Sequence, residues 1–310
     1  MKTLFIFLDG VGLGADDPDL NPLAAATMPF LQSLLGGRRL LLEFAPFEGE
    51  RASLLAIDAN LGVEGLPQSA TGQAALVTGR NVPAELGYHY GPKPNRAVAA
   101  VLANGGIFAR LIAAGKTAAL LNAYPPRYFD GIDSGKRLYS SIPLAVTSAG
   151  LPLFTHEDFT AGRALSADLT GQGWRDFLGF PETRVLTPVE AGTRLASLAS
   201  RYDFSLFEYW STDYAGHKQD MKWALEQLEM IDAVLQGLLE AWDDDQGLVF
   251  ITSDHGNMED LSVRRHTANP VPLLLFGSFE ARRRFAFSIT DLTGIAPAVW
   301  EAIMHSPFTR

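Results

Sequence analysis

The sequence predicts an α/β protein in which a doubly wound, mostly parallel sheet lies in a three-layer α/β/α arrangement. Short apolar runs with the length of buried strands alternate with segments that have helical periodicity. Acidic and histidine residues follow directly after several of these runs. Open α/β sheets bind ligands at the carboxyl ends of their strands, so both observations indicate a site at one edge of the sheet.

The first elements follow in order. The run 5–8 predicts a buried strand, and the two glycines of Asp9-Gly10-Val11-Gly12 predict a tight turn with Asp9 at its tip. The small-residue run 70–77 predicts a helix that begins after Ser69. Residues 107–114 predict another helix, and Gly115 ends it before a strand over 117–121.

The later elements have clearer signals. Thr187-Pro188-Val189-Glu190 is a capping box with proline at the first helical position, which predicts a helix to about Ser200. Residues 223–242 predict the clearest helix, with one apolar face. We expect the opposite face, which carries Glu226, Glu229, Asp232 and Gln236, to be solvated. The remaining predicted elements are strands at 204–210, 248–251 and 273–276 and a closing helical segment at 289–303.

Composition limits the class of protein. A chain of 310 residues with 47% apolar content can bury a large core, and we expect one main domain with an insertion. The net charge of −10 argues against nucleic acid or an anionic membrane as a partner. The absence of cysteine excludes disulfides, thiolate metal sites and cysteine nucleophiles. The first apolar run is too short for a signal peptide, and we expect a cytoplasmic protein without a membrane span.

Paired acids and imidazoles predict a metal site. Asp254-His255-Gly256-Asn257 closes the predicted strand 248–251, and a carboxylate beside an imidazole is a ligand set for Mn²⁺ or Zn²⁺. Asp213 and His217 lie four residues apart and can converge from one turn of chain, and His266 precedes the strand at 273–276. A helix-capping Asp beside an incidental His is the plain alternative for any one pair. The recurrence of the pattern favours metal binding.

Ser69 and Asp9 each have a structural and a chemical interpretation. Ser69 can be the cap of the helix that follows, and Asp9 can bond its own backbone in a turn. A helix N-terminus also suits a phosphate acceptor, because its free N–H groups and dipole favour negative charge. A neutral serine is a poor nucleophile that metal coordination can activate, and no histidine lies near Ser69 in the sequence.

Five motifs, taken in order, resemble the alkaline phosphatase superfamily, and most closely its branch of cofactor-independent phosphoglycerate mutases and phosphopentomutases. They are Asp9-Gly10-Val11-Gly12, Gly65-Leu66-Pro67 followed by Ser69, Asp213-x-x-Gly216-His217, Asp254-His255-Gly256-Asn257 and His266-Thr267-x-Asn269-x-Val271-Pro272. The resemblance covers the first ninety or so residues and most of the chain from about 185 onward. It implies an alkaline-phosphatase-like core made of residues 1–124 and 187–310.

The resemblance also implies two metal sites. Asp213, His217 and His266 match the ligands of one site. Asp9, Asp254 and His255 match the other site, where Ser69 joins as nucleophile and ligand. Thr71 is a rival nucleophile, because some members of the superfamily use threonine. Gln73 stands where the mutase branch usually has histidine, which puts in doubt any substrate contact made by that side chain.

Residues 125–186 interrupt the alternation of strands and helices. They are rich in Pro, Gly, Thr and Asp, and their apolar periodicity is poor. The known mutases carry a cap domain between the halves of the core, so we expect a small cap or specificity insertion here. Arginine binds phosphate and carboxylate groups well, and the candidate substrate contacts are Lys93, Arg127 and Arg137.

These observations predict a two-metal phosphotransferase that acts on a small phosphorylated metabolite through a phosphoseryl intermediate. The three histidine ligands favour Mn²⁺ or Zn²⁺ over Mg²⁺. A phosphatase and a phosphomutase share this chemistry, and the small insertion and Gln73 favour hydrolysis. The alternatives are a phosphoglycerate mutase or phosphopentomutase proper, and a non-catalytic metal-binding protein.

Overall fold

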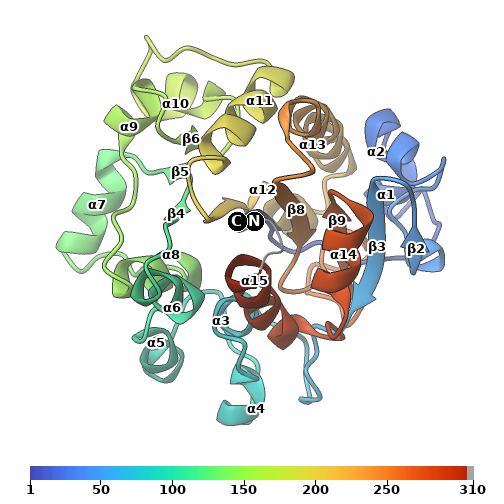
Figure 1. Cartoon of the computed structure of the whole chain (residues 1–310), viewed down its shortest axis with the longest axis horizontal. Coiled ribbons are helices and arrows are strands. Elements are labelled where there is room, and N and C mark those ends of the chain that lie inside the picture. Colours follow the sequence, from blue (N-terminus) through green and yellow to red (C-terminus); the bar gives the residue numbers. More distant parts are fainter. Residues whose placement is uncertain (306–310) are drawn as a thin grey trace.

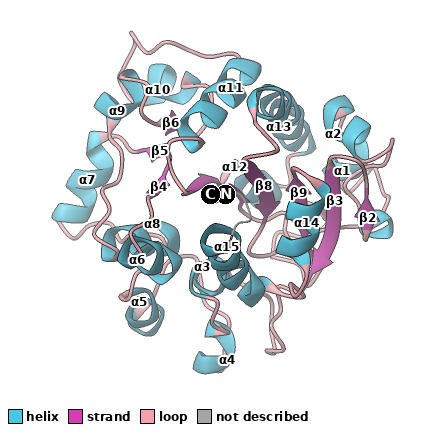
Figure 2. Ribbon diagram, viewed as in Figure 1, coloured by secondary structure: helices cyan, strands magenta, loops and turns pink. Residues whose placement is uncertain are grey.

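A seven-stranded mixed sheet forms the centre of the protein, and a two-stranded sheet lies beside it (Figures 1 and 2). The structure is a computed structural model that describes residues 1–305. The order in the large sheet is β2-β3-β9-β8-β1-β7-β4. Its strands are β1 (Lys2–Leu8), β2 (Phe47–Glu48), β3 (Ala52–Ile57), β4 (Ala118–Leu120), β7 (Phe204–Tyr209), β8 (Gly247–Thr252) and β9 (Val271–Phe276). The small sheet pairs β5 (Asn122–Ala123) with β6 (Leu165–Ser166).

The strands β8, β1, β7 and β4 pair in parallel, and β9, β3 and β2 add antiparallel pairings at one side. The predicted mostly parallel α/β sheet is therefore confirmed, with an antiparallel part that the sequence did not reveal. The antiparallel direction of β9 has a consequence for the site. The loop that leads into β9 lies at the same edge as the carboxyl ends of β1, β7 and β8.

Helices cover both faces of the sheet (Figure 1). One core contains side chains of α1 (Pro22–Ala25), α2 (Pro29–Leu34), α11 (Pro188–Ala199) and α13 (Met221–Ala241). The other core contains side chains of α3 (Ser69–Thr78), α4 (Val82–Leu86), α5 (Arg96–Leu102), α6 (Gly106–Ala113), α8 (Ser141–Ser148), α14 (Phe279–Ala286) and α15 (Ile295–Met304). Because successive strand side chains alternate between faces, Leu4 and Ile6 of β1 join the first core and Phe5 and Phe7 the second.

The predicted helices form close to their expected bounds. The helices expected at 107–114 and 223–242 are α6 and α13. The capping box before α11 has both of its bonds: Glu190 N donates to Thr187 Oγ1 at 3.2 Å, and Thr187 N donates to Glu190 Oε2 at 2.8 Å. Two 3₁₀ turns complete the core, η1 (Leu42–Phe44) and η2 (Leu292–Gly294).

The prediction that Asp232 is solvated was wrong. Its side chain is buried and accepts hydrogen bonds from the backbone N–H groups of Phe30, at 3.0 Å, and Leu31, at 2.7 Å. These donors belong to the first turn of α2, where N–H groups have no partner within the helix. Asp232 thus caps a helix that lies two hundred residues earlier in the chain, and helical periodicity cannot reveal such a contact.

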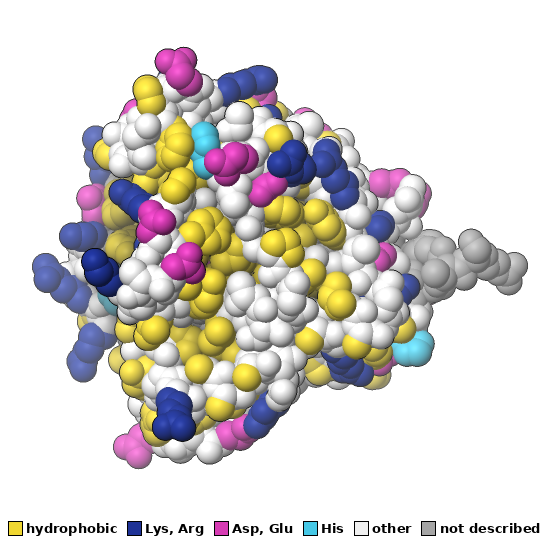
Figure 3. Space-filling view, turned by 90° about the vertical axis from the view of Figure 1, so that its left-hand side faces the viewer, with side chains coloured by type: hydrophobic (Ala, Val, Ile, Leu, Met, Phe, Trp, Pro, Cys, Tyr) yellow, Lys and Arg dark blue, Asp and Glu magenta, His cyan; other side chains and the backbone are white. Residues whose placement is uncertain are grey.

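The segment 125–186 contains α7 (Pro126–Asp133), α9 (His156–Thr160) and α10 (Gln172–Phe177), with α8 among them. The helix α8 packs on α3 and contributes to the second core, whereas Phe159 and Trp174 stack in a small core of their own. Figure 3 shows the side of the molecule that carries α7 and α9, where apolar side chains lie among charged ones. Leu138 and Phe177 in this segment are 60% and 79% exposed.

One helical stretch, residues 96–113, is long and apolar enough to cross a membrane by length and composition. It consists of α5 and α6, which the positive-φ residues Gly105 and Gly106 separate. Both helices pack against α3 and α8, and Val98 and Phe108 are completely buried in the second core. The stretch thus contributes side chains to the second core, although only 33% of its residues are buried.

Candidate metal centre

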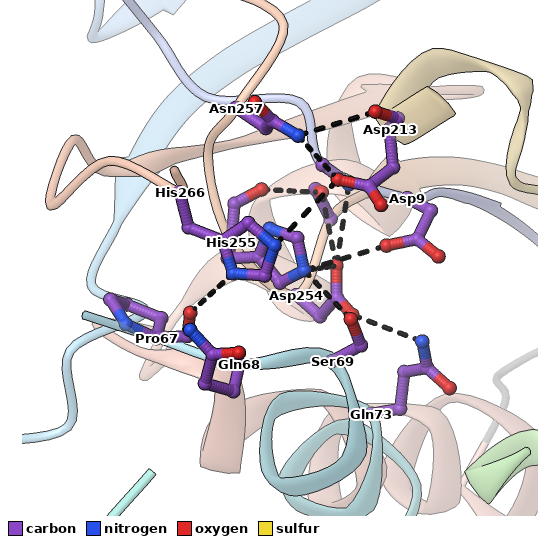
Figure 4. A network of polar contacts seen from close by, with 12 residues as sticks. Asp9, Pro67, Gln68, Ser69, Gln73, Asp213, Asp254, His255, Asn257 and His266 are labelled. Atoms are coloured by element: carbon purple, nitrogen blue, oxygen red, sulfur yellow. Dashed lines mark hydrogen bonds and ion pairs between the residues drawn. The ribbon is translucent and has the colours of Figure 1, made fainter. Parts of the chain in front are cut away.

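Six acidic and histidine side chains meet at the carboxyl edge of the parallel strands, and Figure 4 labels Asp9, Asp213, Asp254, His255 and His266 among them. Asp9 follows β1, and Asp254 and His255 follow β8. The helix α12 (Ser211–Lys218), which follows β7, carries Asp213 and His217. His266 lies in the loop that leads into β9, and Ser69 begins α3 at the same edge. The structure therefore brings together all seven residues that the resemblance implied for metal binding and nucleophilic attack.

The first group consists of Asp213, His217 and His266. His217 Nε2 lies 3.3 Å from Asp213 Oδ2 and 3.3 Å from His266 Nε2. His266 Nε2 lies 3.9 Å from Asp213 Oδ1. Each residue offers one ligand atom within 4.8 Å of the others, which is compatible with one divalent ion.

The second group surrounds His255. Its Nε2 atom lies 3.5 Å from Asp9 Oδ1, 3.7 Å from Asp254 Oδ1 and 3.0 Å from Ser69 Oγ. Asp9, Asp213 and His255 also offer ligand atoms within 4.8 Å of one another, so Asp213 lies between the two groups. The rings of His255 and His266 stack at 3.6 Å, which holds the two groups side by side.

The backbone fixes which nitrogen of each histidine faces the centre. The Nδ1 atoms of His217 and His266 lie 2.8 Å from Arg264 O and 2.7 Å from Pro67 O, and Nδ1 of His255 lies 3.3 Å from Gly256 O. A carbonyl oxygen only accepts, so each Nδ1 carries the proton and a neutral ring has a lone pair on Nε2. The Nε2 atoms of His217 and His266 therefore direct lone pairs toward each other at 3.3 Å, an arrangement that a cation between them satisfies.

The carboxyl groups of Asp9 and Asp254 also lie where a bound cation would stabilise their charged form. Burial and the charge of Asp254 raise the pKa of Asp9 well above its usual range, and burial raises the pKa of Asp254 to about 7. Asp9 Oδ1 is buried without a hydrogen-bond partner. Buried charges in proteins are paired or bind metals. The donor set thus fits divalent ions, with imidazole nitrogen and carboxylate oxygen in both groups.

The imidazoles have different pKa shifts. Burial and the neighbouring His255 lower the pKa of His266 to about 4, which keeps its ring neutral near pH 7. When its ring is protonated, His217 donates from Nε2 to the Asp213 carboxylate, and this hydrogen bond raises the pKa of His217. Burial opposes the charge on Asp213, but the bonds from His217 and Asn257 and the charge of His255 outweigh it, and the pKa of Asp213 falls to about 2.

Two glycines permit these close approaches. Gly10 has a φ of 66°, and a Cβ there would lie 2.5 Å from Asp213 Oδ1. A Cβ at Gly72 would lie 2.9 Å from Asp254 Cβ. A side chain at either position would push a carboxylate away from the centre. The close approach of Asp254 therefore explains why a glycine stands at position 72, three residues after Ser69.

Ser69 and Thr71 differ in the use of their hydroxyl groups. Ser69 is buried at the first position of α3, and its Oγ contacts His255 across 186 residues of sequence. The sequence has no histidine near Ser69, and only the resemblance placed Ser69 at one site with His255, because their contact forms only in the folded chain. The Thr71 hydroxyl instead joins α3 to a neighbouring loop: it lies 3.1 Å from Gln68 O and accepts from Tyr90 N at 3.1 Å.

Gln73 acts on a predicted ligand. Its Nε2 donates to Asp254 Oδ2 at 3.0 Å, and both side chains are buried. The amide thus orients a carboxylate of the second group without adding a charge. This residue was noted in the sequence as a departure from the mutase pattern, and its contact with Asp254 was not expected.

Glu259 is a site residue that the sequence analysis missed. Its buried carboxylate accepts from Gly12 N and Asn257 N, both at 2.8 Å, from Asn269 Nδ2 at 3.0 Å, and from the Thr267 hydroxyl. It therefore joins the turn after β1 to the loops on either side of His266. The only feature of the sequence that could have indicated Glu259 was its position two residues after the motif Asp254-His255-Gly256-Asn257.

A cavity of about 380 Å³ opens beside Asp9, Ser69, Gln73, Asp213 and His217. Lys93 and Arg137 line it, and Arg127 is not among its lining residues. Lys93 follows Gly91, at which a Cβ would lie 3.1 Å from Ser69 N. Neither Lys93 nor Arg137 forms an ion pair with a carboxylate in residues 1–305. The cavity therefore brings together a buried serine, the predicted metal-ligand residues and two cationic side chains without an ion pair.

Comparison with known proteins agrees with this geometry. Residues 189–307 match the model of the Metalloenzyme superfamily. A 2,3-bisphosphoglycerate-independent phosphoglycerate mutase from Antithamnion sp. is 29% identical over 108 residues, which are 33% of this chain and 21% of the mutase. The chain thus matches about a fifth of the length of that relative.

Two solved structures share the fold. A protein from Pyrococcus horikoshii superposes with a TM-score of 0.52 at 17% identity, covering 89% of this chain and 85% of its own. The alkaline phosphatase from the Antarctic bacterium TAB5 superposes with a TM-score of 0.50 at 14% identity, covering 97% of each chain. The three-layer core and its sheet therefore have the same fold as these two structures.

Proposed function

We propose that this chain, which belongs to the alkaline phosphatase superfamily of metalloenzymes, is a metal-dependent phosphotransferase that acts on a small phosphate monoester through a phosphoserine at Ser69. One observation carries the proposal. The Nε2 atoms of His217 and His266 face each other at 3.3 Å, and His255 Nε2 lies 3.0 Å from Ser69 Oγ. A metal-ligand set is thus adjacent to a buried serine at a helix N-terminus.

The chain supplies two sets of ligands. Asp213, His217 and His266 would hold one ion, and Asp9, Asp254 and His255 would hold the other together with Ser69. When bound, two divalent ions, Mn²⁺ or Zn²⁺, supply Lewis-acid stabilisation of the attacking and leaving oxygens. The stacked rings of His255 and His266 and the glycines at positions 10 and 72 keep both sets in place.

The reaction proceeds in two steps at Ser69. Its Oγ forms a bond to phosphorus, the bond from phosphorus to the ester oxygen breaks, and the alcohol leaves. The new phosphoserine lies at the first position of α3, where the positive end of the helix dipole favours its negative charge. Lys93 and Arg137 contact anionic oxygens of the ester in the cavity. A second nucleophile then takes the phosphoryl group from Ser69.

We favour water as the second nucleophile, which makes the enzyme a phosphatase. A mutase must retain its dephosphorylated intermediate and exclude water during reorientation, which a closing cap achieves. The insertion is small, part of it packs into the core as α8, and Gln73 is committed to Asp254. A phosphoglycerate mutase or phosphopentomutase proper is the second candidate, and the name of the Antithamnion relative supports the phosphoglycerate mutase.

Enzyme loaded with Mn²⁺ or Zn²⁺ tests the proposal. The substrates are 3-phosphoglycerate, ribose 5-phosphate and an aryl phosphate, and free phosphate and isomers are measured separately. We expect phosphate release, loss of about 10³-fold or more of kcat in Ser69→Ala, and less than about tenfold loss in Thr71→Ala. Isomerisation without phosphate release would show that the enzyme is a mutase and not a phosphatase. Failure of all substrates with both metals would contradict the enzyme and favour a non-catalytic metal-binding protein.

A further inference from the structure

The cavity beside Ser69 has a second polar wall that no metal ligand forms. Glu208 lies next to last in β7, paired in register with Phe7 of β1, and is only 5% exposed. Tyr124 and Tyr128 come from the start of the insertion and line the cavity with it. A buried carboxyl group among aromatic rings is unusual without a defined partner.

Glu208 is held firmly on one side. The Asn122 side chain bridges its backbone, since Nδ2 donates to Glu208 O and Glu208 N donates to Oδ1, both at 2.8 Å. The Tyr124 hydroxyl donates to Glu208 Oε1 at 2.5 Å. Asn122 belongs to β5 and Tyr124 follows it, so the chain entering the insertion positions this carboxyl group.

Hydrogen-bonding capacity remains unused on the cavity side. Glu208 Oε2 receives no hydrogen bond from the described part of the chain, and Glu208 forms no ion pair there. The Tyr128 hydroxyl is buried and has no partner either. Most buried polar groups in proteins are hydrogen-bonded, so each exception at a cavity calls for a partner such as a water molecule, an ion or a ligand. Burial also raises the pKa of Glu208 to about 7 and raises the pKa of the Tyr128 hydroxyl above its ordinary value, as expected for groups shielded from water.

The charges that line the cavity indicate which kind of ligand group can donate a hydrogen bond to Glu208. An ammonium group would pair with Glu208, but Lys93 and Arg137 line the same space, and Arg137 lies over the Tyr128 ring at 4.7 Å. These cations repel an ammonium group at short range. A hydroxyl group carries no such penalty. The rings of Tyr128, Trp210 and Tyr214 offer apolar faces to the carbon skeleton of a polyol.

We propose that Glu208 and Tyr128 form a subsite that hydrogen-bonds hydroxyl groups on the alcohol portion of the ester, so that the site selects sugar or polyol monophosphates. This inference rests on the proposed function and assigns specificity to the wall opposite the metal ligands. Glu208 accepts from a ligand hydroxyl through Oε2. The Tyr128 hydroxyl bonds a neighbouring oxygen of the same ligand.

Binding to the Ser69→Ala protein, with Zn²⁺ present, tests the subsite without turnover. Calorimetry compares glycerol 1-phosphate with propyl phosphate, which lacks the hydroxyls, and with O-phosphoethanolamine, which carries an ammonium group. We expect glycerol 1-phosphate to bind at least about tenfold more tightly than propyl phosphate. Adding Tyr128→Phe or Glu208→Gln should reduce this ratio about fivefold or more, since each removes or alters one partner. Tyr128→Phe removes only an unpartnered hydroxyl, so its fold should be intact.

A matched control is Glu229→Gln, which changes an exposed carboxyl group on α13 and should leave the ratio as it was. Equal ratios in all variants would overturn the subsite, as would an equal loss of binding for all three esters. Tightest binding of O-phosphoethanolamine, lost in Glu208→Gln, would overturn the hydroxyl assignment in favour of an ammonium ligand. Each of these failures leaves phosphate release by the Ser69 enzyme as a separate result, so the proposed function is judged independently.

Discussion

Individual side chains at this site act by orienting one another. Three histidines use Nδ1 on backbone carbonyls and leave Nε2 for the centre. Gln73 and Asn257 act similarly on carboxylates, since their amides donate to Asp254 Oδ2 at 3.0 Å and Asp213 Oδ1 at 2.7 Å. Such partners of metal ligands fix the geometry of the ligand, and their loss commonly costs 10–100-fold in metal affinity or activity.

Gln73→Ala should therefore weaken metal binding. The substitution removes the donor to Asp254 and leaves that buried carboxylate free to turn. We expect Zn²⁺ affinity to fall about 10–100-fold, measured by competition with a chelating indicator. Gln172→Ala, at an exposed position in the insertion, is the control and should keep the original affinity. Unchanged affinity in a folded Gln73→Ala protein would show that the amide does not position Asp254.

Glu208 should make stability depend on pH. Its pKa is raised by burial to about 7 in the folded protein, against 4.5 as the ordinary value. The folded state therefore holds a proton that the unfolded state releases between these values, and stability is lost as the pH rises through this window. The shift corresponds to about 3 kcal/mol. Urea unfolding of the metal-free protein measures this effect. Between pH 4.5 and 8.5, the free energy of unfolding of the wild type should fall by about this much relative to that of Glu208→Gln. A constant difference between the two proteins would contradict the prediction.

At the scale of elements, two connections between strands meet at Glu259 beside the centre. Glu259 accepts hydrogen bonds from the turn after β1 and from both ends of the connection 253–270, which joins β8 to β9. The strands determine where each loop begins, and Glu259 determines how the loops sit relative to one another. Asp232 has a comparable role between α13 and α2.

Glu259→Gln should loosen this junction. The amide nitrogen of glutamine would face donors, which leaves at least one buried N–H or hydroxyl group without an acceptor and costs about 1–3 kcal/mol. We expect that loss in the free energy of unfolding, measured in urea, together with weaker Zn²⁺ binding. Glu226→Gln, on the exposed face of α13, is the control for the change of residue type. A stable Glu259→Gln protein with normal metal affinity would show that Glu259 does not support the site.

Elements with local signals were predictable from the sequence. The capping box before α11 and the periodicity of α13 follow from short-range rules of helix formation. Asp232 was misplaced because its partners are backbone groups of a distant helix. The antiparallel entry of β9 was also not predictable, since an apolar run carries no sign of strand direction.

At the scale of the whole molecule, the site joins residues from position 9 to position 266. Strand ends indicated that acids and histidines would gather at one edge, and the resemblance sorted them into two groups. The resemblance placed Ser69 and His255 at one site, and their side chains lie in contact. The contact of Tyr124 with Glu208 depends on tertiary packing, so neither motif nor spacing could reveal it. The cavity and its second polar wall depend on the path of the insertion, where sequence periodicity was weakest.

Metal binding should consequently stabilise the entire fold. The proposed ligands come from the turn after β1, from α12 and from both ends of the connection between β8 and β9, so unfolding any of these elements would disperse the site. A ligand that binds only the folded state stabilises it by about 4 kcal/mol at a thousand times its dissociation constant. We expect Zn²⁺ or Mn²⁺ to raise the melting temperature and excess chelator to reverse the rise.

Two histidine variants make this test specific. His266→Ala removes a ligand with a buried ring and should lose most of the metal-induced rise. His305→Ala changes an exposed histidine after α15 and should keep it. Ser69→Ala should also keep most of the rise, because six other ligands remain. An equal rise in His266→Ala and wild type, measured by calorimetry at matched metal concentration, would mean that the metals stabilise the protein at some other place. The reason is thermodynamic: the rise reports the difference in metal affinity between the folded and unfolded chain, and only residues that create that difference can change it.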